Sequence, residues 1–184
     1  LSQLAAGPPG FKTLTPYVPK GLSMKHLALF MNKTFSGRLN EDRIKAIRDR
    51  WQGKLVVKGI VNEEDCEKVV RLGADGIIAS NHGGRQLDAG QSTIKPLPSL
   101  VRSFGDKLTI MIDSGIRSGP DIACALASGA RFTFLGRSFM YGVGALGRKG
   151  GDHTISMLKR QLQQIMEQLA CERVADFPAH LVED

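Results

Sequence analysis

The segment at residues 80–88, which reads SNHGGRQLD, combines residue types that could carry acid–base chemistry on a small anion. His82 can accept or release a proton near neutral pH. Arg85, a little further along the same segment, can bind a carboxylate through two parallel hydrogen bonds. The two glycines between them allow backbone conformations that a side chain would block. A base beside a carboxylate-binding arginine indicates chemistry on a small organic acid.

Short apolar runs predict strands, and each strand leads into a polar residue. The runs lie at 54–58, 76–79, 108–112 and 132–135. Lys58, His82 and Asp113 stand at or just past the ends of the first three runs, and Arg137 follows the fourth. Apolar residues at helical spacing predict helices at 23–31, 41–51, 63–72, 97–104, 119–129 and 153–170. Strands that alternate with helices predict a parallel sheet with right-handed crossovers.

Both a doubly wound sheet and a (β/α)8 barrel fit this alternation. No G-x-G-x-x-G motif follows the first strand, which disfavours a dinucleotide-binding doubly wound sheet. Polar residues at successive strand ends converge on one face of a barrel, where barrel active sites lie. The loops after the last two strands carry glycine and arginine, the residue types that bind phosphate through backbone N–H groups and charge. These residues are Gly115, Ile116 and Arg117 in one loop and Gly136 and Arg137 in the other.

Composition narrows the classes of partner. The formal net charge of +7 favours anionic ligands, but basic residues are scattered and aromatic residues are few, so we expect no nucleic-acid surface. No apolar run approaches the roughly 20 residues of a membrane span, and we recognise no signal peptide. The three cysteines form no C-x-x-C pair, so we expect reduced core thiols in a cytoplasmic protein and no metal site.

The order and spacing of the motifs resemble a known family. LVVKG at 55–59, SNHGGRQLD at 80–88, DSGIRSG at 113–119 and LGRSFMYG at 135–142 are similar to the FMN-dependent α-hydroxy-acid dehydrogenases and oxidases. This family includes L-lactate dehydrogenase, glycolate oxidase and mandelate dehydrogenase. The resemblance covers about residues 40–184, and the nine-residue block around His82 is its most specific part.

The resemblance implies a role for each matched residue. His82 is expected to take the substrate proton as the general base, and Arg85 to bind the substrate carboxylate. Lys58 is expected beside the flavin N1 and C2 carbonyl, where its charge favours the reduced ring. The remaining cofactor-binding residues are expected to run from the ribityl chain to the FMN phosphate: Asp113, Ser114, Gly115, Ile116, Arg117, Gly136 and Arg137. The other histidines, His26, His153 and His180, are assigned no role.

The chain is predicted to be the C-terminal half, strands five to eight, of a (β/α)8 barrel, because a complete barrel needs eight strands and about 250 residues. We expect one domain over 1–184, with a loop-rich lead-in at 1–40 and four β/α units at 41–184. Before residue 40 there is no strand that ends in Asp-Thr-Pro, the motif expected to supply an acidic partner for the histidine. Exposed sheet edges predict a homo-oligomer or pairing with the missing half-barrel.

The resulting functional prediction is FMN-dependent oxidation of a small L-2-hydroxy acid to the 2-oxo acid. The electron acceptor is oxygen, a quinone or a cytochrome, and the location is cytoplasmic or peripheral at the inner face of the membrane. Two alternatives remain open: a non-redox enzyme on a phosphate-binding barrel, and a truncated fragment without catalysis.

Overall fold

The computed structural model describes residues 14–18, 23–34 and 39–182, and the chain divides into two compact units at 1–40 and 41–184. The first unit contains the 3₁₀ turn η1 (Thr15–Tyr17) and the helix α2 (Met24–Thr34). The helix predicted at 23–31 is therefore present and extends further. Much of the predicted loop-rich lead-in, at 1–13, 19–22 and 35–38, lies outside the described residues.

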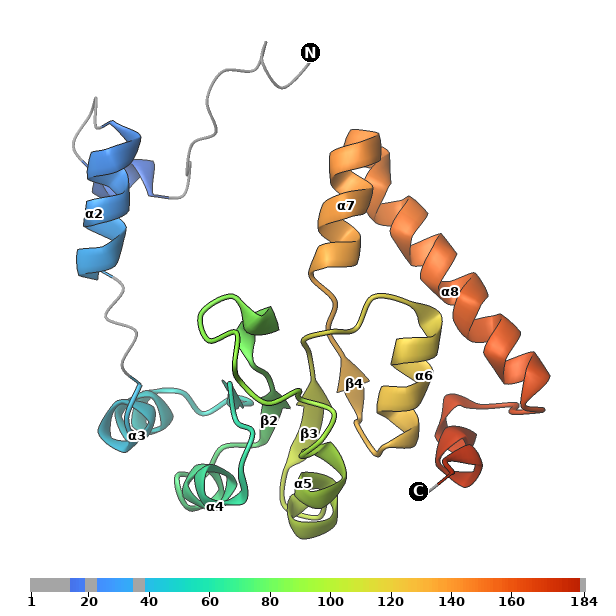
Figure 1. Ribbon diagram of the computed structural model, residues 1–184. Helices are drawn as coiled ribbons and strands as arrows, with labels where there is room; N and C mark the ends of the chain where they lie inside the picture. The colour runs from blue at the N-terminus through green and yellow to red at the C-terminus, as the bar shows by residue number, and fades with distance from the viewer. Residues whose placement is uncertain (1–13, 19–22, 35–38, 183–184) are drawn as a thin grey trace. The chain divides into compact units, whose positions relative to one another are not determined.

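The second unit is an α/β structure built on a parallel sheet, as the sequence predicted. The strands β1 (Val56–Lys58), β2 (Gly76–Ala79), β3 (Thr109–Ile112) and β4 (Phe132–Thr133) are hydrogen-bonded in chain order. The helices α3 (Glu41–Arg50), α4 (Glu63–Arg71), α5 (Leu97–Phe104) and α6 (Gly119–Ala127) precede or connect these strands (Figure 1). The Asn62 side chain caps α4 by accepting the N–H of Asp65, and Pro120 occupies the first turn of α6.

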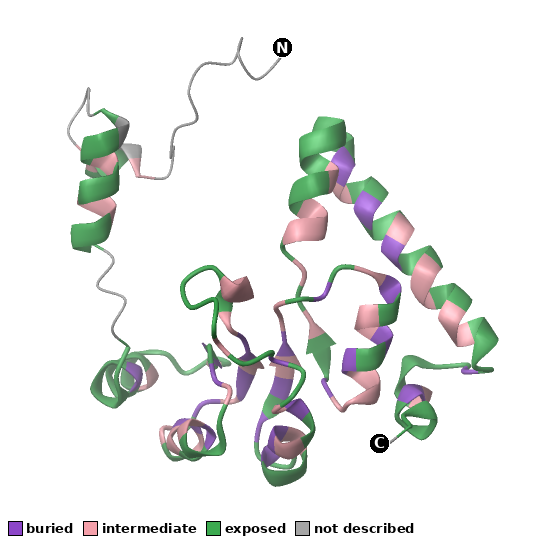
Figure 2. Ribbon diagram, viewed as in Figure 1, coloured by how far each residue is buried: buried purple, intermediate pink, exposed green. Residues whose placement is uncertain are grey.

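One face of the sheet carries the core. Val57, Ile77 and Ile110 are aligned across β1, β2 and β3 and are buried. They meet the apolar sides of the helices, including Leu97 and Leu100 of α5, which are fully buried. Figure 2 shows the buried residues gathered where the helices meet the sheet. Because neighbouring strand residues point to opposite faces, this packing leaves the alternate residues on the other face.

The second face of the sheet is only partly covered by the residues that the structure describes. Lys58, Ile78, Met111 and Phe132 form the aligned row on this face, and Phe132 remains 56% exposed. Within the described chain, β1 and β4 each have a neighbouring strand on one side only. Parallel sheets normally have both faces covered, and among the described residues this face is covered only in part.

Asp75 stabilises the end of the sheet where the strands begin, just before β2. Its carboxylate contacts Lys54 Nζ at 2.7 Å and Arg48 Nη1 at 3.3 Å and accepts the Leu55 N–H at 2.9 Å. The hydrogen bonds from Lys54 and from the Leu55 N–H lower the pKa of Asp75 to about 2. The contacts join α3 to the starts of two strands, at the end of the sheet opposite the polar strand ends.

The C-terminal part contains more elements than the sequence predicted. The sequence predicted a single helix at 153–170, but the chain forms α7 (Arg137–Leu146), the turn η3 (Gly147–Lys149), the long helix α8 (Gly150–Gln168) and the turn η4 (Val174–His180). Helix α7 carries two glycines that lower its intrinsic helix propensity. Gly142 is required because any Cβ there would collide with Thr154 of α8. The packing of α7 on α8 therefore outweighs the low helix propensity of its glycines.

The cysteines also differ in part from the prediction. Cys66 and Cys171 are buried free thiols, whereas Cys124 is a free thiol on the exposed side of α6. Burial raises the pKa of Cys66 to about 11. None of the described helices is long and apolar enough to cross a lipid bilayer.

Candidate functional site

A pocket of about 520 Å³ lies at the carboxyl ends of the four strands. Every residue that the sequence analysis assigned to the site lines it, so the structure brings all of them together. The lining residues are Lys58, His82, Gly83, Arg85, Asp113, Ser114, Gly115, Ile116, Arg117, Phe134, Leu135, Gly136, Arg137, Met140 and Tyr141. Polar side chains come from the end of β1, the loops after β2 and β3 and the first residue of α7. Apolar ones include Phe134 and Leu135, which follow β4, and Met140 and Tyr141 of α7.

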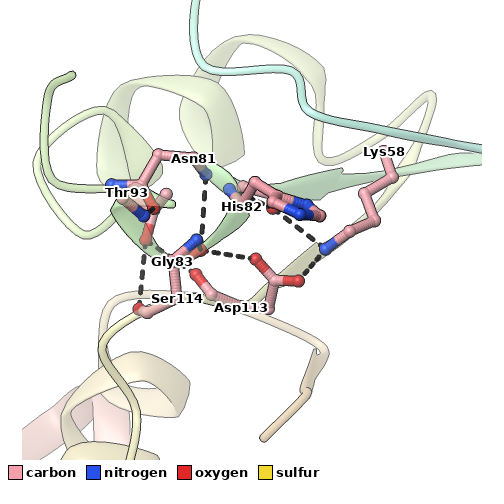
Figure 3. A network of polar contacts seen from close by, with 9 residues as sticks. Lys58, Asn81, His82, Gly83, Thr93, Asp113 and Ser114 are labelled. Atoms are coloured by element: carbon pink, nitrogen blue, oxygen red, sulfur yellow. Dashed lines mark hydrogen bonds and ion pairs between the residues drawn. The ribbon is translucent and has the colours of Figure 1, made fainter. Parts of the chain in front are cut away.

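Lys58 and Asp113 form an ion pair at the floor of this pocket (Figure 3). Lys58 Nζ also donates to Ser80 Oγ at 2.9 Å, and Ser80 is buried. Partial burial lowers the pKa of Lys58 from its ordinary value, while the adjacent carboxylate favours its charged form. The side chain is still 46% exposed, so a ligand in the pocket can reach its charge.

The loop after β2 presents His82 and Arg85 toward solvent. The short turn η2 (His82–Gly84) holds His82 at φ 58°, a left-handed conformation that residues with a Cβ adopt rarely. Asn81 caps this turn by accepting the N–H of Gly84 through its side-chain oxygen at 3.2 Å. Neither the imidazole of His82 nor the guanidinium of Arg85 has a protein hydrogen-bond partner among the described residues. Both groups are therefore available to a ligand.

The loops after β3 and β4 expose backbone to the pocket. Gly115 has φ 82°, and a Cβ added to it would meet no atom within 4 Å. Gly136 precedes α7, whose first N–H groups have no partner within the helix, and a Cβ added there also meets no atom within 4 Å. The backbone N–H of Arg117 donates to Asp121 at 2.9 Å, and residue 117 is exposed.

Arg137 makes a contact that the sequence did not predict. Its Nη2 donates to the carbonyl oxygen of Gly83 at 2.6 Å. The guanidinium carries five N–H donors in a planar fork, so this bond leaves others for an anion. Arg137 thus joins the start of α7 to the loop that carries His82.

Sequence reasoning missed buried hydroxyls that organise the site. Ser80 binds Lys58, and Thr93 donates through Oγ1 to the carbonyl oxygens of Asp113 at 2.8 Å and Ser114 at 3.4 Å. Ser80 could have been found, because it begins the SNHGGRQLD block. Thr93 gives no local signal, since its partners lie 20 and 21 positions away. Among the described residues, no group of three or more His, Cys, Asp and Glu could hold a metal ion.

Comparison with known proteins identifies the family. Residues 5–184 match the family model described as FMN-dependent dehydrogenase. The L-lactate dehydrogenase of Actinobacillus pleuropneumoniae serotype 5b is 37% identical over 164 residues, which cover 89% of this chain and 43% of that protein. The L-lactate dehydrogenase of Vibrio parahaemolyticus is 41% identical over 148 residues, which cover 80% of this chain and 39% of that protein.

Solved structures agree with these relatives. A soluble mutant of the membrane-associated (S)-mandelate dehydrogenase from Pseudomonas putida superposes with a TM-score of 0.82 at 36% identity, covering 96% of this chain and 51% of that one. A mandelate oxidase with benzoyl-formic acid gives a TM-score of 0.72 at 34% identity, covering 76% of this chain and 42% of that one. The chain spans about half, or less, of the length of these relatives. On these matches, the chain belongs to the FMN-dependent dehydrogenase family.

Proposed function

We propose that this chain carries the proton-abstracting and phosphate-binding half of an enzyme that oxidises a small L-2-hydroxy acid to the 2-oxo acid with FMN. The observation that carries the proposal is the convergence of three groups in one pocket: the exposed imidazole of His82, the exposed guanidinium of Arg85 and the partly buried ammonium of Lys58. The names of its relatives, which refer to lactate and mandelate, support this class of substrate.

The residues on the phosphate side fit an FMN phosphate. Gly115 and Gly136 leave open space beside backbone that faces the pocket, and the start of α7 favours an anion. Arg117 and Arg137 add positive charge, so we assign the phosphate to these four residues and Ile116. Asp113 and Ser114 are assigned to the ribityl chain and Lys58 to the flavin ring. When bound, FMN supplies the acceptor for the two electrons of the oxidation.

The side chains of this chain perform the remaining tasks. Arg85 binds the substrate carboxylate through its planar fork and so directs the α-carbon toward the cofactor. His82 takes the proton of the substrate, which makes the loss of two electrons from the α-carbon favourable. Ser80 and Ser114 hold the backbone at His82 and its two neighbours through hydrogen bonds, so substrate binding needs little reorganisation at the base.

We further propose that the fold is the C-terminal half, strands five to eight, of a (β/α)8 barrel and that residues 41–184 hold its four β/α units. The exposed row that contains Phe132 and the two unpaired sheet edges support this, because a closed barrel would cover both. The missing cover is the other half-barrel or a second copy of the chain. The proposed location is the cytoplasm or the inner membrane face, and a membrane-associated relative supports the second.

The test is anaerobic flavin bleaching. Purified chain is titrated with FMN, and L-lactate, glycolate or (S)-mandelate is added without oxygen. We expect the flavin absorbance to bleach, His82→Ala to prevent bleaching while FMN affinity is kept, and Arg85→Lys to weaken substrate binding because lysine lacks the planar fork. The matched control is His153→Ala, which changes an exposed histidine on α8. FMN binding without bleaching would favour the non-redox alternative, and no FMN binding would favour a fragment without catalysis.

A further inference from the structure

We propose that Ser114 is a positioning residue for His82. The hydroxyl of Ser114 clamps the backbone on both sides of the histidine by accepting hydrogen bonds from it. The inference rests on the proposed role of His82 as the base. Ser114 itself was expected only to contact the cofactor, so this role adds a second task to that residue.

The hydroxyl of Ser114 uses its full hydrogen-bonding capacity in this clamp. Ser114 Oγ accepts the backbone N–H of Asn81 at 3.3 Å and that of Gly83 at 3.0 Å. These are the residues directly before and after His82. The same hydroxyl donates its proton to Asp113 Oδ1 at 2.8 Å. A hydroxyl has one donor and two acceptor sites, so all three are occupied, as Figure 3 shows.

His82 and the serine that holds its neighbours, Ser114, both have unusual backbone conformations. His82 has φ 58° and Ser114 has φ 74°, and both values lie in the left-handed region that a Cβ disfavours. Such conformations persist where the surroundings hold them. Ser80 Oγ supports the His82 side by accepting the His82 N–H at 3.2 Å. On the other side, the buried Thr93 fixes Ser114 by donating to its carbonyl oxygen.

The charge beside Ser114 orients its hydroxyl. Asp113 is ion-paired with Lys58, and a carboxylate is the stronger acceptor for the hydroxyl proton. The proton therefore points to Asp113, and the lone pairs of Oγ point to the N–H groups that flank His82. Lys58 closes a ring of contacts, because its Nζ also donates to Ser80 Oγ. The position of the base thus depends on the same ion pair that lines the pocket.

If Ser114 served only to hold its own backbone conformation, a different result would be expected on substitution. If only the backbone conformation mattered, glycine would serve as well as serine, because glycine adopts positive φ without steric cost. Ser114→Gly therefore relieves the strain and removes the clamp, while Ser114→Ala removes the clamp and keeps the strain. The matched control is Ser156→Ala, which changes an exposed serine on α8.

The first measurement is amide hydrogen exchange of the whole chain without cofactor. NMR monitors the exchange at each residue. In both Ser114 variants we expect the amides of Asn81 and Gly83 to exchange roughly 5- to 30-fold faster, the factor expected for losing one hydrogen bond each. The Gly59 amide is the internal reference, because it donates to the carbonyl oxygen of Ile78, outside the loop that carries His82. Unchanged exchange at Asn81 and Gly83 overturns the proposal.

The second measurement separates positioning from general structure. In FMN-loaded protein, Ser114→Gly should slow anaerobic bleaching by about 10-fold or more with substrate KM little changed. The slowing should persist at saturating FMN, because Ser114 acts through His82 and not only through cofactor binding. A bleaching rate that saturating FMN restores overturns the proposal. If the unaltered chain does not bleach, the proposed function fails, and the exchange measurement alone decides the clamp.

Discussion

Two glycines of the pocket have equal room for a Cβ but different backbone conformations, and this difference predicts their response to alanine. Gly115 has φ 82° and Gly136 has φ −102°. At both positions an added Cβ would meet no atom within 4 Å. Steric collision is therefore absent in both cases, and the backbone conformation is the variable that differs.

Gly115→Ala should destabilise the chain by roughly 1–2 kcal/mol, the cost of holding one residue with a Cβ in the left-handed region. Gly136→Ala should change stability by less than about 0.5 kcal/mol, because alanine adopts its conformation readily and no atom must move. With a urea m-value of about 2 kcal/mol/M, the first variant should lower the midpoint by about 0.5–1 M. Urea unfolding without cofactor, followed by circular dichroism, measures both.

Equal stability of the two variants would refute the reasoning, since it would show that the loop after β3 does not hold Gly115 in a left-handed conformation. FMN affinity provides a separate readout. If the phosphate lies beside both glycines, both methyl groups intrude on it, so both variants lose affinity while Gly115→Ala alone loses stability.

Three further predictions concern stability and thiol reactivity. The pKa of Asp75 is lowered mainly by Lys54, so the unfolded chain binds the extra proton between pH 3.8 and about 2, and stability falls as pH drops through this window. Asp75→Asn should flatten that dependence in urea midpoints, and parallel curves would contradict it. Leu97→Ala, in the core, should cost about 2–5 kcal/mol in urea unfolding, whereas the exposed control Leu87→Ala should stay within about 0.5 kcal/mol. A thiol reagent should modify Cys124 first in the native chain, because it is the exposed thiol, and Cys124→Ser should remove that fast phase.

The sequence predicted the strand ends and the residues gathered there because both depend on local patterns. An apolar run followed by a polar residue marks where a parallel strand ends, and all such ends meet at one edge of the sheet. Lys58, His82, Asp113 and Arg137 were placed by this argument, and the structure brings them into one pocket. Their proposed roles as base, flavin contact and phosphate ligands stay predictions until the bleaching and affinity experiments are done.

The contacts between loops could not be predicted, because they depend on distance in space. Thr93 and Ser114 act on residues far along the chain, and nothing in their neighbouring sequence indicates the partner. Helix α7 was missed for a related reason: Gly142 lowers helix propensity locally but permits contact with Thr154 of α8. Long-range packing decided both cases.

The loop that carries His82 is held by three other parts of this chain. Ser114 holds it from the loop after β3, Arg137 holds Gly83 from the start of α7, and Lys58 reaches it from β1 through Ser80. The exposed row on the second face of the sheet, by contrast, has no such support within the described residues. The backbone geometry around the proposed base is therefore determined by contacts inside residues 58–137.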